Sequence, residues 1–281
     1  MSIKEQLQRQ VQFFHPEKKY SFLRGGFSSA AHAALFGLRE QFYNSIKETF
    51  ANRVNEVAEV LCQDSDYVEA IKAMPLIPKG KTKARVVVIG DSLTDDSQSW
   101  FAIIARSFAI IRPSDNIRFT NLAVSGDTTT QLLGSVIPAA QMKADLYLCF
   151  SGTNDARIQG GSRYKPCTSI DEVGRNLASV IDFGQEHTKA PWIWLTPVGV
   201  DPARVAEHEF LKPLMASWCN DHINQVADVI KQQAEKVIDL RPHFGDLQDS
   251  PLLDEDGLHW SIDGHQLAAK VIIKQLATLL G

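Results

Sequence analysis

Three side chains in two short segments have the residue types that catalyse acyl transfer. Ser92, in the sequence Gly-Asp-Ser-Leu, carries a hydroxyl that becomes a nucleophile when a base removes its proton. His259 could be that base, because an imidazole accepts and returns a proton near neutral pH. Asp256 stands three residues before His259 and could accept a hydrogen bond from the ring, which would fix its tautomer. Together they have the composition of a serine-nucleophile triad.

Two further residues could stabilise the negative charge that develops on a carbonyl oxygen during such a reaction. Gly126 could donate its backbone N–H, since a residue without a side chain lets a substrate approach closely. The amide of Asn154, in Ser-Gly-Thr-Asn-Asp, could donate a hydrogen bond without titrating. Each segment also has a simpler explanation: a helix cap at Ser92, plain turns at Gly126 and Asn154, and a solvated loop at residues 254–259.

These segments lie among apolar runs that alternate with amphipathic stretches after residue 84. Five alternations of this kind predict a parallel sheet with helices on both faces. In such sheets the ligand site lies at the carboxyl ends of the strands, where Ser92, Gly126 and Asn154 are expected. The strands are predicted at residues 85–89, 117–122, 146–150, 192–196 and 237–240, and the helices at 100–111, 129–143 with a break at Pro138, 170–187, 205–236 and 264–280.

The first 78 residues contain helical patterns and no strand pattern. Ser2 and Glu5 have the spacing of a capping box, which predicts a helix that ends at His15 and Pro16. Apolar residues then recur every three to four positions as far as Leu61, which predicts one long helix that begins near Ser28 or Ser29. A shorter helix is predicted at residues 65–74. The polar connector at residues 75–83 predicts a boundary between a helical extension, residues 1–78, and a catalytic domain, residues 79–281.

The apolar stripe of the long helix, residues 35–61, must be covered by something. We expect it to pack beside the catalytic domain of the same chain. A homodimer formed through these helices is the second possibility, and an arm that binds another protein or a membrane surface is the third.

Composition excludes several classes of protein. The chain has 281 residues, of which 44% are hydrophobic and 22% charged, as in an average globular protein. Its net charge of −4 argues against nucleic acid as a partner, because that binding needs a concentrated basic surface. No apolar run approaches the roughly 18 residues of a membrane span, and no secretory signal is seen, so cytoplasmic residence is expected. The four cysteines are widely spaced and are expected to be reduced thiols.

The polar segments resemble a known family when they are taken together. Gly-Asp-Ser-Leu-Thr-Asp, the Gly126 segment, Gly-Thr-Asn-Asp and Asp-Gly-Leu-His follow one another in the order found in GDSL, or SGNH, hydrolases. The resemblance covers residues 85–281. It implies a three-layer α/β/α sandwich of flavodoxin type, with the strands in the order 2-1-3-4-5, and no metal or organic cofactor.

The resemblance also implies a role for each residue. Ser92 would be the nucleophile and would donate its backbone N–H to the oxyanion, together with the N–H of Gly126 and the side-chain amide of Asn154. His259 would act as general base and then as general acid, oriented by Asp256. Two features depart from the family: Trp260 stands where Pro or Leu is common, which could alter the wall of the site, and about eighty helical residues precede the first motif.

We therefore expect a serine esterase that hydrolyses a carboxylic ester or thioester through an acyl-enzyme on Ser92. The substrate would be a small, lipid-like or acylated-sugar ester. The alternative is an acyltransferase with the same acyl-enzyme and an acceptor other than water, and a non-catalytic binding module is a third possibility. Trp100, Phe101, Ile103 and Tyr164 lie near the motifs and could line an acyl pocket, although the first three could equally be core residues.

Overall fold

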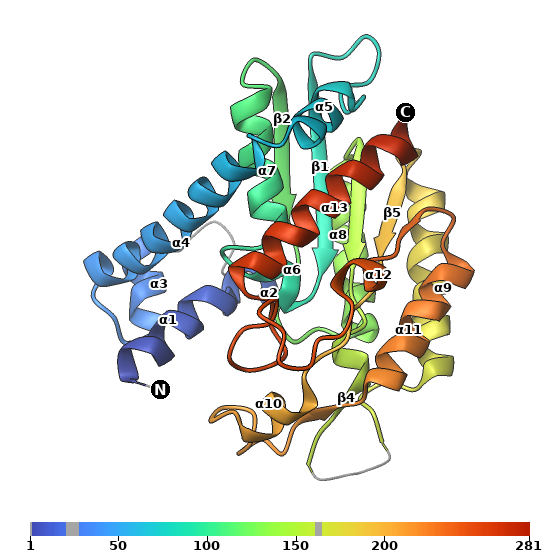
Figure 1. The fold of residues 1–281 in the computed structure, drawn as a ribbon. Helices are drawn as coiled ribbons and strands as arrows, with labels where there is room; N and C mark the ends of the chain where they lie inside the picture. Colours follow the sequence, from blue (N-terminus) through green and yellow to red (C-terminus); the bar gives the residue numbers. More distant parts are fainter. Residues whose placement is uncertain (1, 21–27, 161–164) are drawn as a thin grey trace.

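The computed structural model of the chain describes residues 2–20, 28–160 and 165–281. Its centre is a five-stranded parallel sheet with the order β2-β1-β3-β5-β7 (Figure 1). When these five strands are numbered among themselves along the chain, the order is 2-1-3-4-5, as the resemblance implies. The sheet consists of β1 (Lys83–Gly90), β2 (Asn116–Asn121), β3 (Leu146–Phe150), β5 (Trp192–Leu195) and β7 (Val237–Ile238). A separate antiparallel pair is formed by β4 (Arg157–Ile158) and β6 (Ser217–Trp218).

Helices cover both faces of the sheet, so the catalytic region is a three-layer sandwich, as expected. One face is covered by α4 (Glu40–Leu61), α5 (Ser65–Ala73), α7 (Trp100–Ile111), α12 (Arg241–Phe244) and α13 (Ile262–Leu280). The other face is covered by α8 (Thr129–Gln141), α9 (Ile170–His187) and α11 (Asn220–Gln233). The remaining helices are α1 (Ile3–Phe13), α2 (Pro16–Lys19), α3 (Ser29–Leu35), α6 (Ser92–Asp95), the short 3₁₀ helix at Asn154–Ala156, and α10 (Pro202–Glu207).

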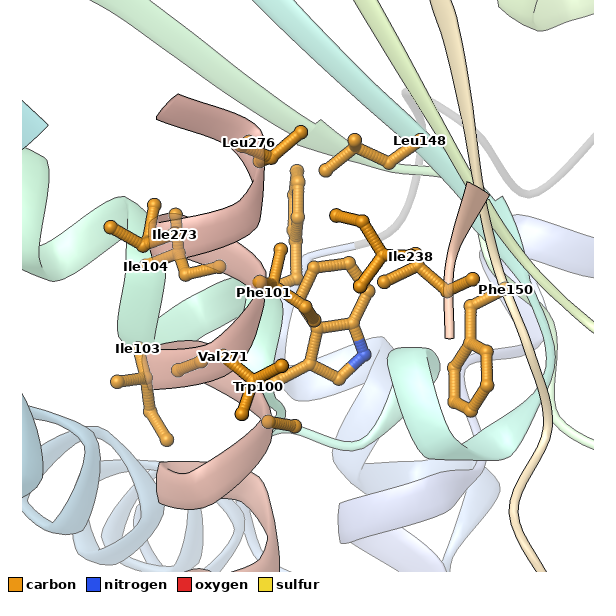
Figure 2. Packing of buried hydrophobic residues seen from close by; sticks show 14 of the residues in the cluster. Trp100, Phe101, Ile103, Ile104, Leu148, Phe150, Ile238, Val271, Ile273 and Leu276 are labelled. Atoms are coloured by element: carbon orange, nitrogen blue, oxygen red, sulfur yellow. The ribbon is translucent and has the colours of Figure 1, made fainter. Parts of the chain in front are cut away.

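Strand β1 shows why the sequence folds this way. Val86 and Val88 belong to the core on the α7 and α13 side, whereas Val87 and Ile89 belong to the core on the α8 and α9 side. Successive side chains of a strand point to opposite faces, so an unbroken run of β-branched residues suits a strand buried on both. Figure 2 shows the first of these cores, where aromatic and aliphatic residues of α7 and α13 meet those of β3 and β7.

The predicted long helix is wrong, because the chain forms α3 and α4 instead. Gly37 has a φ of +66°, and the N–H groups of Gly37 and Leu38 donate to the carbonyl oxygens of Ala34 and Ala33. This pattern of two hydrogen bonds around a left-handed glycine ends α3. The helix is therefore interrupted at the one residue of the stripe that adopts a left-handed conformation without steric cost.

Two other helix predictions also need correction. Pro138 lies inside α8 and does not break it. The residue four positions earlier is the exposed Gly134, whose carbonyl can be hydrated when its helical partner is lost. The single helix predicted at residues 205–236 is α10, β6 and α11, with Pro213 and the left-handed Met215 in the intervening turns.

Most of the apolar stripe of the extension is covered by the same chain. Phe50, Val54, Ala58 and Leu61 of α4 are buried, and the last three share the core of the sheet with α7 and α13. Leu35 and Phe42, at the start of the stripe, remain exposed. Packing beside the sandwich, the first of the three possibilities, is therefore observed, and nothing about the stripe now requires a dimer. The division of the chain at residues 78 and 79 stays a prediction. In the described part of the chain, no helix combines the length and apolar character of a membrane span.

Candidate active site

Ser92 is the first residue of α6, directly after β1. Asp91 caps this helix, because its Oδ1 accepts a hydrogen bond from the N–H of Leu93 at 3.1 Å. The helix-cap explanation is therefore correct for Asp91, and it leaves the hydroxyl of Ser92 available for another partner. The backbone N–H of Ser92 is at the first position of the helix, where N–H groups have no acceptor within their own helix.

The hydroxyl of Ser92 lies next to the ring of His259. The Nε2 atom of His259 lies 3.0 Å from Ser92 Oγ, and its Nδ1 atom lies 2.6 Å from Asp256 Oδ2. The other oxygen of Asp256 accepts hydrogen bonds from the N–H groups of Leu258, at 2.9 Å, and of His259 itself, at 2.8 Å. The carboxylate thus faces Nδ1, and a neutral ring protonated there leaves Nε2 free to accept the hydroxyl proton of Ser92.

The loop that carries Asp256 and His259 is fixed from the α10 side. The guanidinium of Arg204 donates to the carbonyl oxygen of Ser250 at 2.7 Å and to that of Asp254 at 3.2 Å. Gly257 has a φ of +68°, and a Cβ at this position would lie 2.7 Å from the carbonyl oxygen of Asp201. The glycine in Asp-Gly-Leu-His is therefore required both by the backbone conformation and by this close approach.

Gly126 and Asn154 reach the same place from the ends of β2 and β3. Gly126 has a φ of +85°, and a Cβ built on it would meet open space. The Nδ2 of Asn154 donates to the carbonyl oxygen of Asp127 at 3.1 Å, which orients the amide and uses one of its two N–H groups. Neighbouring Asp155 accepts hydrogen bonds from the N–H and hydroxyl of Thr129 at the start of α8, so the two loops are joined.

All five residues predicted from the sequence line one pocket of about 440 Å³. Its apolar lining includes Phe210, Leu211 and Trp218 from the segment after α10. The five residues come from three strand-to-helix loops and the loop before α13, which converge at one end of the sheet. This arrangement places a hydroxyl, an imidazole, a carboxylate and candidate hydrogen-bond donors around one cavity.

A family model for the GDSL-like Lipase/Acylhydrolase family matches residues 88–267, which is well over half of the chain. The chain belongs to this family. Its general activity is accordingly that of an ester hydrolase. A search of curated proteins finds no match to it.

Solved structures similar to this GDSL-family chain share its fold at low sequence identity. LAE5, an alpha/beta hydrolase enzyme from the metagenome of Lake Arreo in Spain, is 19% identical with a TM-score of 0.55, over 70% of this chain and 97% of LAE5. Axe2, an acetylxylan esterase from Geobacillus stearothermophilus, is 18% identical with a TM-score of 0.53, over 72% of this chain and 96% of Axe2. The acetyl xylan esterase AlAXEase is 18% identical with a TM-score of 0.53, over 67% of this chain and 97% of its own.

Three of the four residues that could have lined an acyl pocket lie in the core instead. Trp100, Phe101 and Ile103 are buried in the core that α7 and α13 form on this side of the sheet (Figure 2), and Tyr164 lies outside the described residues. Trp260 is buried against Phe150 and Phe244, with ring centroids 5.3 and 4.6 Å away, and is not part of the pocket wall. The unusual residue of the family motif therefore acts in the core of this enzyme.

His265 has a structural role. It is fully buried at the start of α13, and its Nδ1 accepts a hydrogen bond from the backbone N–H of Trp100 at 3.3 Å. Its Nε2 lies 3.3 Å from Asp96 Oδ2. The ring thus joins α13 to the segment that follows Ser92.

Sequence reasoning missed the residues that α1 and α2 bring to this end of the sheet. Arg9 forms ion pairs with Asp254 and Asp256, and the ring of Phe13 lies against that of His259. Beyond α1, His15 Nδ1 lies 2.8 Å from Asp95 Oδ1, and Lys18 also pairs with Asp95. These partners are about 80 residues away in the sequence or farther, so no local spacing could reveal them.

Burial and charge act in opposite directions on two carboxyl groups of the site. Asp256 is almost fully buried, which by itself would raise its pKa, but His259 and then Arg9 outweigh burial and lower the pKa below its usual value. Asp91 is buried just as deeply, and there burial outweighs the N–H of Leu93 and the nearby His259 and raises the pKa to about 7. Asp256 therefore stays ionised at neutral pH, as a partner of His259 must.

Proposed function

We propose that this enzyme is a serine esterase that hydrolyses carboxylic esters through an acyl-enzyme on Ser92. The observation that carries the proposal is the continuous series of short contacts from Ser92 Oγ to His259 Nε2, at 3.0 Å, and from His259 Nδ1 to Asp256, at 2.6 Å. A serine hydroxyl needs an adjacent base to attack a carbonyl at neutral pH, and the base needs a partner that fixes its tautomer.

In the first step His259 takes the proton of Ser92 as Oγ attacks the ester carbonyl. The tetrahedral oxyanion is then held by the N–H groups of Ser92 and Gly126 and by the amide of Asn154. Collapse of this intermediate breaks the bond to the alcohol, which leaves with the proton from His259. Water repeats the sequence on the acyl-enzyme: His259 takes a proton from the water, the acid leaves, and the proton returns to Ser92.

The substrate is proposed to be a small, lipid-like or acylated-sugar ester. A pocket of about 440 Å³ with aromatic and aliphatic residues in its wall suits a modest acyl or alcohol group. Acetylated xylooligosaccharides belong in the test set because similar structures bear the names of acetyl xylan esterases. Cytoplasmic residence, expected from the sequence, stays a prediction.

The test combines kinetics with covalent labelling. A fluorophosphonate is expected to label Ser92, identified by peptide mass spectrometry, and Ser92→Ala is expected to abolish both labelling and hydrolysis while the thermal midpoint stays nearly unchanged. Ser125 provides the matched control, because it lines the same pocket but its hydroxyl donates to Asp95 at 2.9 Å. Label that survives in Ser92→Ala, or is lost only in Ser125→Ala, would refute the assignment.

The substrate class is measured separately. Rates with p-nitrophenyl esters of increasing acyl length, and acetate release from acetylated xylooligosaccharides, would show which ester is preferred. Adding alcohol or amine acceptors to the same reactions distinguishes hydrolysis from acyl transfer, because a transferase would form the acylated acceptor in preference to the free acid.

A further inference from the structure

Helix α1 lies outside the region matched by the family model, yet it forms one wall of the pocket. The family model begins at residue 88, whereas α1 ends at residue 13. Figure 1 shows α1 near the end of the sheet where β1 leads into α6. The pocket residues from α1 and the position after it are Gln6, Arg9, Gln10, Phe13 and Phe14.

Arg9 holds the carboxylate that faces His259. Its guanidinium donates to Asp254 at 2.9 Å and, through a second nitrogen, to the same oxygen of Asp256 that faces His259 Nδ1. Asp256 is almost fully buried, whereas Asp254 is one third exposed. The planar guanidinium therefore links two carboxylates that stand two residues apart and would otherwise repel each other.

Phe13 holds the imidazole itself. Its ring centroid lies 4.3 Å from that of His259, with an angle of 36° between the planes, and the Arg9 guanidinium lies 5.5 Å from the same phenyl ring. Phe13 is thus in contact with both the ring of His259 and the side chain that binds Asp256. An imidazole packed in this way has less freedom to rotate away from Ser92.

The helix that carries these residues is fixed to the loop after Ser92. Gln12 is buried, and its Nε2 donates to Asp96 Oδ2 at 2.8 Å. Its carbonyl oxygen accepts a hydrogen bond from the N–H of Ser97 at 3.1 Å. Because Asp96 and Ser97 follow directly after α6, the position of α1 is tied to that of the nucleophile.

We propose that α1 is a working part of the active site, in which Arg9 and Phe13 are positioning residues for the Asp256–His259 pair. Arg9 sets the place and charge of Asp256, and Phe13 sets the plane of the His259 ring. The inference rests on the proposed function, since these residues act on catalysis only if His259 is the base. The helical extension would then contribute to catalysis, in addition to packing against the core of the sheet.

The test for Arg9 uses three variants of the full chain. Arg9→Met is expected to lower kcat about 10- to 100-fold, the loss typical of a hydrogen bond to a charged group, with a smaller change in KM. Arg9→Lys keeps the charge but not the fork of donors, so it should recover part of the loss. Lys4→Met is the matched control: it removes one positive charge from an exposed position of the same helix and should leave kcat unchanged.

The test for Phe13 compares Phe13→Ala with Phe13→Leu. The alanine variant leaves the face of the imidazole uncovered and is expected to lower kcat, whereas leucine retains much of the contact and should recover part of the activity. Thermal midpoints of all variants are measured alongside. If the midpoint falls while kcat remains that of the parent enzyme, α1 has only a structural role and the proposal is wrong.

A spectroscopic readout separates this inference from the proposed function. The Nδ1 proton that His259 shares with Asp256 should give a low-field resonance in a histidine-labelled sample, assigned by its loss in His259→Gln. In Arg9→Met and Phe13→Ala this resonance is expected to move or to broaden through faster exchange with water. An unchanged resonance together with unchanged kcat would overturn the role of α1. Full hydrolysis by Ser92→Ala would overturn the proposed function, and the resonance would still report whether α1 holds the pair.

Discussion

The buried carboxyl of Asp91 should make the folded protein less stable as the pH rises through neutrality. Asp91 is 1% exposed, and its Oδ2 has no hydrogen-bond partner among the described residues. Burial raises its pKa to about 7, from an ordinary value of about 3.9. The native state therefore keeps this proton up to about pH 7, whereas the unfolded chain loses it near pH 4.

The sign and size of the effect follow from that difference. Above pH 4 the native state binds more protons than the unfolded state, so the stability contributed by Asp91 falls as the pH rises and levels off above pH 7. A rise of about three pKa units corresponds to about 4 kcal/mol. In Asp91→Asn the Oδ1 acceptor for the N–H of Leu93 is retained, and the side chain is neutral at every pH. The variant should gain about 1 kcal/mol over the parent at pH 4.5, where the unfolded carboxyl has already begun to ionise. At pH 8 it should gain about 4 kcal/mol, or roughly 8 °C in thermal midpoint.

The assay is urea or thermal unfolding of both proteins between pH 4.5 and 8.5. Replacing the carboxyl hydroxyl by an amide could also change the free energy of unfolding, but by the same amount at each pH. The test is therefore how the stability difference between variant and parent changes with pH. Asp182→Asn, at an exposed position of α9, is the matched control and should show a small and constant difference. A difference between Asp91→Asn and the parent that stays constant over this range would refute the reasoning.

Three further predictions concern the site and the sheet. Asn154→Ala should lower kcat by about 10²–10³ with little change in KM, as expected for one lost oxyanion donor, and steady-state kinetics measure both. Asp256→Asn should lower kcat by about 10⁴, because the amide favours the wrong tautomer of its histidine partner, whereas Asp254→Asn should cost less than about tenfold; the reverse order would exchange their roles. Gly90→Ala should lower the free energy of unfolding by more than about 3 kcal/mol, because its Cβ would lie 2.2 Å from the carbonyl oxygen of Phe150. Thermal unfolding should therefore show a much lower midpoint. An unchanged midpoint would contradict the pairing of β1 with β3.

The catalytic half of the fold was predictable because its local and global signals agree. Each buried strand is a short apolar run with a polar loop at its carboxyl end, and the right-handed crossover of parallel strands leaves few arrangements. Ser92, Gly126 and Asn154 lie in those loops, so the topology of the sheet alone brings them to one edge. Asp256 and His259 follow because His259 stands three positions after Asp256, a separation that one turn of loop can close.

The helix predictions failed where one residue outweighed a longer pattern. Apolar spacing continues from Leu35 past Gly37, and the pattern alone predicts a single helix. A glycine in the left-handed conformation ends α3 in spite of it. Pro138 shows the opposite outcome, since a strong breaker is tolerated in α8. In both cases the hydrogen bonds available to a few backbone groups decide the result, and the side-chain pattern does not record them.

The role of α1 could not be predicted, because its contacts join residues 245 or 247 positions apart. One local signal was nevertheless present. A helix that only fills a core buries aliphatic residues, whereas the buried positions of α1 are Val11 and Gln12, flanked by the half-buried Arg9 and Phe13. Polar groups on an inward face are costly unless they meet partners there. Arg9 finds its partners in Asp254 and Asp256, and Gln12 finds one in Asp96. An inward face with an arginine and a glutamine is therefore a local sign that the helix binds against polar groups and not only against a core.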